Sequence, residues 1–158
     1  NLGGYRLTDR WPDESNHQLA FTFPDITLAP GAVVVVFNGF GAAMSGPVGD
    51  ESSSPLRPHP EFHDALVFSM RNERSSRAFT NRADAVNLFA PSGAPVEAVY
   101  WGEPAPPPPS RCPRIFEADK SPKGSVQRAG SEHEFTDHAN LDAEGLFSPG
   151  RVPPGNVP

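Results

Sequence analysis

Two pairs of histidines are close enough in the sequence to suggest a metal site. His133 and His138 lie five positions apart, and His59 and His63 lie four apart. Zinc ligation from one face of a helix needs histidines four positions apart, so the first pair does not fit this motif. Prolines on both sides of His59 keep it out of a helix. The histidines are therefore better explained as solvated loop residues.

Nucleophilic catalysis is also weakly supported. Ser125, Asp137 and His138 supply the residue types of a hydrolase triad, but the sequence lacks the Gly-x-Ser-x-Gly turn that exposes such a serine. Glycoside hydrolysis needs two converging carboxylates, and nothing in the distribution of the nineteen acidic residues nominates a pair. The sequence therefore predicts a chain without catalytic activity of its own.

Oxygen ligands suited to a hard cation cluster in one polar segment between two predicted strands. Asp9, Asp13, Glu14 and Asn16 lie there, without the spacing of an EF-hand loop. A calcium site in this loop is one hypothesis, and the alternative is that these side chains only keep the connection soluble. No other cofactor is expected.

Arg71, Arg74, Arg77 and Arg82 form the basic cluster of a chain whose formal net charge is −6. The planar guanidinium group suits phosphate, sulfate and carboxylate. We expect a protein, an anionic polymer or a charged surface as partner, whereas the net negative charge disfavours nucleic acid. The alternative is a solvated connection whose charges balance nearby acids.

Tyr100 and Trp101 are neighbours in one predicted strand, so their side chains point to opposite faces of a sheet. Tyr100 shares its parity with Val96 and Ala98 and is expected in the core. Trp101 is a candidate binding residue, because an exposed indole can stack on a sugar or a peptide.

Proline and glycine contents favour strands and turns over helices, because the chain has twenty prolines and fourteen glycines. Pro30 and Gly31 fit a type II turn, and Gly93 fits a hairpin turn. Segment 32–37 is apolar at every position, so we expect a central strand covered on both faces; it is too short to span a bilayer. Apolar residues at alternate positions, or short apolar runs, predict strands within 5–7, 19–23, 32–37, 65–70, 85–89, 95–101 and 124–128.

Several segments along the chain resemble segments of a lamin-tail domain and occur in the same order. They are 1–9, 21–24, 28–42, 83–89 with the hairpin to 100–102, 124–128 and 148–150. The resemblance implies one domain over 1–158, an all-β, immunoglobulin-like antiparallel β-sandwich with long irregular insertions. Segments 39–64 and 103–123 would be these long loops, and 148–158 a tail rich in proline and glycine.

The resemblance also implies a function. Lamin-tail domains usually begin one or two strands earlier, so we interpret the chain as a fragment that could self-associate through an uncovered strand edge. The implied role is a non-catalytic interaction or scaffolding module of a larger bacterial protein, located outside the cytoplasm or secreted. The alternative is an accessory domain of an extracellular nuclease or phosphatase whose catalytic domain lies outside this chain.

Overall fold

The computed structural model describes residues 1–9, 20–37, 58, 60–69, 79, 82–103, 107–118, 126–129 and 134–137. Regular structure in these ranges consists of strands and one short 3-10 helix, which confirms the all-β prediction. No helix within them is long and apolar enough to cross a bilayer. The elements are β1 (Arg6–Thr8), β2 (Ala20–Thr22), β3 (Val34–Phe37), η2 (Pro60–Phe62), β4 (Leu66–Ser69), β5 (Ala83–Phe89), β6 (Pro95–Gly102), β7 (Ile115–Glu117), β8 (Val126–Ala129) and β9 (Glu134–Asp137).

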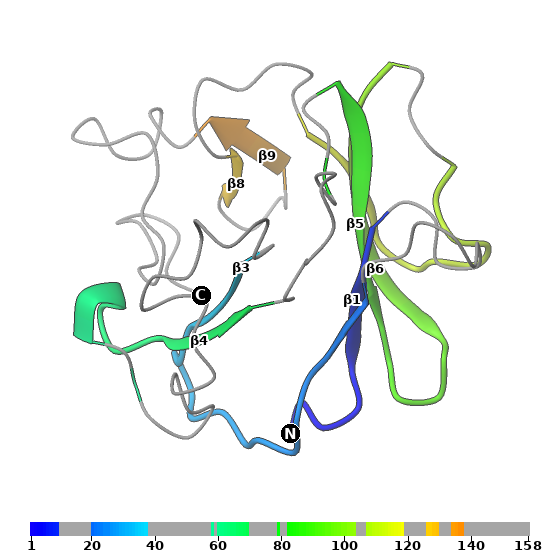
Figure 1. Cartoon of the computed structure of the whole chain (residues 1–158). Coiled ribbons are helices and arrows are strands. Elements are labelled where there is room, and N and C mark those ends of the chain that lie inside the picture. Colours follow the sequence, from blue (N-terminus) through cyan, green and yellow to red (C-terminus); the bar gives the residue numbers. More distant parts are fainter. Residues whose placement is uncertain are drawn as a thin grey trace.

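The largest sheet has five strands in the order β2-β1-β5-β6-β7. Strands β3 and β4 form a second sheet, and β8 and β9 form a third. Figure 1 shows both small sheets on the same side of the layer that contains β1, β5 and β6. The strands therefore form two facing layers, and the face of the large sheet that points toward the small ones is its inner face.

Aromatic side chains connect the layers at both edges of the large sheet. Phe21, on edge strand β2, lies 5.3 Å from Phe68 of β4 between ring centroids. At the other edge, Phe116 of β7 lies 5.6 Å from Phe135 of β9. Phe23 completes the first contact, because its ring meets that of Phe21 edge-on at 5.0 Å. Burying an aromatic side chain of this size contributes roughly 2 to 3 kcal/mol, so these contacts hold the layers together.

The sheets were predicted to be antiparallel, but two of their strand pairs are parallel. Strand β3 pairs in parallel with β4, and β6 pairs in parallel with β7. Parallel neighbours need a crossover that returns the chain to the start of the next strand, usually of a dozen or more residues. Segments 38–65 and 103–114 provide these crossovers. The prediction of one loop over 103–123 is accordingly wrong at Ile115–Glu117, which forms β7.

In the part of the chain that the structure describes, the strand rich in valine is not central. All four residues of β3 are half-buried, and within the described residues its one partner is β4. The covered strand is β4, in which Val67 and Phe68 are buried although they point to opposite faces. Apolar residues at every position predicted a strand correctly, but they did not determine its place in the layer.

Both predicted glycine turns are confirmed. The amide of Ala32 donates a hydrogen bond to the carbonyl of Ala29 at 3.0 Å, and Gly31 has a φ of 78°. This is the geometry of a type II turn. In the hairpin between β5 and β6, Gly93 has a φ of 82° and its amide donates to the carbonyl of Ala90 at 2.9 Å.

Replacement of Gly102 by alanine should destabilise the protein strongly. Gly102 has a φ of +84°, and an added Cβ would lie 1.8 Å from the carbonyl oxygen of Arg82. Gly93→Ala is the matched control, because its φ is +82° with no atom within 4 Å of the added Cβ. We expect a loss of about 3 kcal/mol or more for Gly102→Ala, against about 1 to 2 kcal/mol for the control. Urea denaturation followed by circular dichroism measures both, and equal losses would contradict the steric argument.

Candidate functional site

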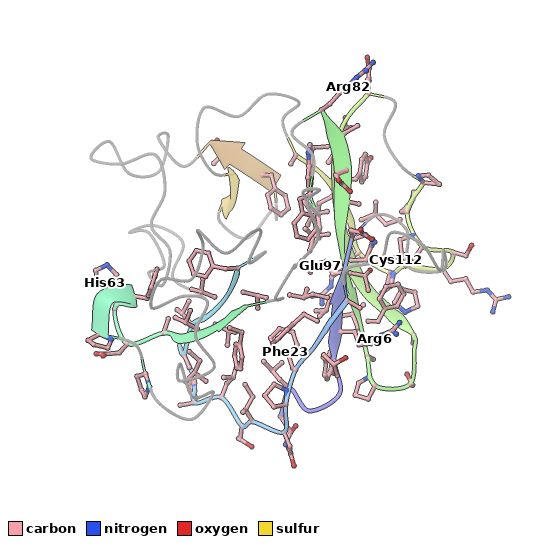
Figure 2. The ribbon with its side chains drawn as sticks, in the orientation of Figure 1. Arg6, Phe23, His63, Arg82, Glu97 and Cys112 are labelled. Carbon is pink, nitrogen blue, oxygen red and sulfur yellow. The ribbon has the colours of Figure 1, made fainter. Side chains whose placement is uncertain are left out.

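The structure brings together two of the predicted binding residues, Arg82 and Trp101. Strand β5 begins directly after Arg82, and its first residue, Ala83, pairs with Gly102, the residue after Trp101. Because Gly102 has no side chain, the Arg82 carbonyl can approach its backbone closely. Figure 2 shows Arg82 at the far end of β5, well separated from Arg6. We call Phe79, Arg82 and Trp101 the Arg82 end.

Trp101 forms the aromatic part of the Arg82 end. Its ring centroid lies 6.4 Å from that of Phe79, with the planes inclined by 49°. Trp101 is half-buried, so the indole packs against the protein and still offers part of its surface to a partner.

Trp101 shares its face of the sheet with Val99, whose partner Phe116 contacts β9, so Trp101 lies on the inner face. Tyr100 is half-buried on the outer face with buried Ala98, and not between the two layers as expected.

Arg82 supplies the positive charge. It is exposed, and its guanidinium forms no ion pair with any described residue. Two other described arginines have close neighbours: Arg6 lies 5.8 Å from the ring centroid of Phe89, and Arg114 lies 3.4 Å from the carboxylate of Glu97. The Arg82 charge is therefore available to an anionic partner.

Asp84 is a polar residue of this region that the sequence did not single out. It is 1 % exposed and lies directly opposite Trp101 in the β5–β6 register. The amide of Ala85 donates a hydrogen bond of 2.9 Å to its Oδ1 atom. The sequence signal for its burial was its position between two small apolar residues, Ala83 and Ala85. Carboxyl groups are rarely buried without hydrogen bonds, so a buried Asp84 needs a donor such as the Ala85 amide.

Asp9, the first residue of the predicted calcium loop, is buried rather than solvated. Its backbone carbonyl accepts two hydrogen bonds, from Asn87 Nδ2 at 2.7 Å and from Thr8 Oγ1 at 3.1 Å. The paired residues Thr8 and Asn87 are each 1 % exposed, so the three residues form a buried polar junction between β1 and β5. Within the described residues, Asn87 Oδ1 accepts no hydrogen bond.

Several predicted site residues lie outside the described ranges. They are Arg71, Arg74 and Arg77 of the basic cluster and Asp13, Glu14 and Asn16 of the calcium loop. Calcium binding therefore stays a prediction. Among the residues that the structure does describe, no group of three or more His, Cys, Asp and Glu side chains could hold a metal ion.

Comparisons with known proteins do not identify the chain. No model of a protein family matches it, and the searches of curated proteins and of solved structures give no match.

Asn87→Asp should destabilise the protein in a way that depends on pH. The introduced carboxylate cannot donate to the Asp9 carbonyl and would be buried beside it, which we expect to cost about 2 to 4 kcal/mol at pH 7. Burial should raise the pKa of the introduced carboxyl group. The loss is then largest above that pKa and shrinks as the pH falls through it, because the protonated group can donate again.

Urea denaturation of the wild type and the variant at pH 7 and pH 4.5 tests this expectation. Thr8→Val is the matched control, because it removes the second donor to the same carbonyl without adding a charge. It should cost about 1 kcal/mol at both pH values. A loss for Asn87→Asp that is the same at both pH values would mean that the introduced carboxylate is not buried beside the carbonyl.

Proposed function

We propose that this chain is a non-catalytic interaction module, an immunoglobulin-like β-sandwich of the lamin-tail type within a larger bacterial protein that acts outside the cytoplasm. The two facing layers of strands support the proposal. So does the position of the similar segments: 1–9 ends in β1, 28–37 contains the type II turn and β3, and 83–102 forms the β5–β6 hairpin. The sequence segments that resemble lamin-tail domains thus supply the scaffold.

The binding surface in this proposal is the Arg82 end. The observation that carries it is the pairing of Ala83 with Gly102, which places exposed Arg82 and half-buried Trp101 at the same end of the β5–β6 hairpin. Arginine binds carboxylate, sulfate or phosphate through its planar group, while an aromatic ring adds apolar contact. The preceding Arg71, Arg74 and Arg77 add positive charge in the adjoining sequence. An acidic protein segment or an anionic polymer is the partner that this chemistry favours.

The same surface would serve an accessory domain of a secreted hydrolase. In that setting the module would hold the enzyme on an anionic polymer or surface, and the catalytic residues would lie in another domain. Both settings require the same property of this chain, which is binding of negative charge at the Arg82 end.

Charge reversal at Arg82 should weaken binding to an anionic polymer. We expect Arg82→Glu to elute from immobilised heparin at lower salt and to bind heparin about fivefold more weakly, because one favourable contact becomes repulsive. The double variant Arg74→Glu and Arg77→Glu should weaken binding further. Heparin serves only as a probe of anionic charge.

The matched control is Arg6→Glu, which makes the same charge change at an exposed arginine far from the Arg82 end. It should alter retention much less than Arg82→Glu. Equal effects of the two variants would mean that heparin senses only the net charge of the chain. Unchanged retention of Arg82→Glu would refute the proposed surface.

A further inference from the structure

Segment 107–111, in the connection between β6 and β7, presents prolines to solvent. Pro107 and Pro108 are exposed, and Figure 1 shows this part of the chain, in yellow-green, on the side of the large sheet away from β3 and β4. A residue that precedes a proline is restricted to extended conformations, so both residues adopt the polyproline II conformation. Within the described residues, their carbonyl groups accept no hydrogen bond. The segment therefore offers rigid apolar rings together with free backbone acceptors.

A strained turn follows the prolines and carries an exposed arginine. The amide of Cys112 donates to the carbonyl of Pro109 at 3.2 Å, and Arg111 has a φ of 63°, which is the geometry of a type II turn. This position favours glycine, because a side chain strains the left-handed backbone. Arg111 is exposed and forms no ion pair with a described residue. An arginine where glycine would be less strained indicates a role for its side chain outside the fold.

The order of these residues matches that of segments recognised in the polyproline II conformation. The sequence from 106 to 111 reads Pro-x-x-Pro-x-Arg. Domains that bind such segments have a groove lined by aromatic rings, which pack on exposed proline rings. The hydroxyl and indole N–H groups of these rings can donate hydrogen bonds to the free carbonyl groups, and a carboxylate at the end of the groove would pair with Arg111. A stiff spacer would need the prolines but not the exposed arginine.

We propose that segment 107–111 docks into the aromatic groove of a polyproline-binding domain in a partner protein. The fold prepares the segment for docking, because it is held between β6 and β7, and the amide of Ala98 donates to the carbonyl of Arg114 at 2.9 Å just beyond the turn. A polyproline II segment also loses little conformational entropy on binding, since its backbone is already extended. The segment shares no residue with the Arg82 end, so this inference does not depend on the proposed function.

An array of immobilised SH3, WW and EVH1 domains, read by surface plasmon resonance, tests the proposal. The wild-type chain should bind at least one of these domains. Pro108→Ala should weaken that binding about tenfold, because a ring contact and part of the backbone rigidity are lost. Pro91→Ala is the matched control, since Pro91 is an exposed proline in the β5–β6 hairpin, and it should leave binding unchanged. Arg82→Glu should also leave it unchanged, which separates this inference from the proposed function.

Arg111→Gly distinguishes a binding role from a structural one. The change removes the charge and relieves the left-handed φ, so it should weaken binding about fivefold without lowering the temperature of unfolding. A chain that binds none of the domains up to its solubility limit would overturn the proposal. Equal losses of binding for Pro108→Ala and Pro91→Ala, or binding that neither Pro108→Ala nor Arg111→Gly weakens, would also overturn it.

Discussion

The arrangement of the two layers depends on aromatic contacts at the two edges of the large sheet. Phe21 meets Phe68 at one edge, and Phe116 meets Phe135 at the other. Between these edges the inner face of the large sheet carries apolar residues at alternate positions, such as Leu7 on β1. A sheet with one apolar face is stable only when another layer covers that face.

The sequence was most informative where strands are long and regular. Strands β5 and β6, with the hairpin between them, were predicted within two residues at each end, because alternation and turn glycines agree there. Strands β7 and β9 were missed. Each has three or four residues and contains charged side chains, so alternation has too few positions to stand out. Their existence depends on contacts with distant strands, which a local pattern does not contain.

The candidate site was predicted in part. Arg82 and Trp101 were predicted as binding residues from the chemistry of their side chains. Their position at the same end of the β5–β6 hairpin depends on strand register, which a local pattern does not give. Buried Asp84 and Asn87 were not identified, because polar residues within a strand are usually assigned to its solvent face. For Asp9 the error is the reverse. This acidic residue was assigned to a solvated loop, but it is buried, and its backbone carbonyl accepts hydrogen bonds from Thr8 and Asn87. Burial of polar groups is a tertiary property, and composition alone does not reveal it.

The pairing of β1 with β5 has a kinetic consequence. Thr8 and Asn87 are neighbours in the sheet although most of the first half of the chain separates them, whereas β5 and β6 are joined by a short turn. A hairpin of the latter kind forms within about 1 to 10 μs, but closing a long loop costs entropy before any contact repays it. The hairpin can therefore serve as the early template, and β1 docks onto it late in the reaction. Such distant pairings place this fold among the slow folders of its size, with folding times of about milliseconds to seconds.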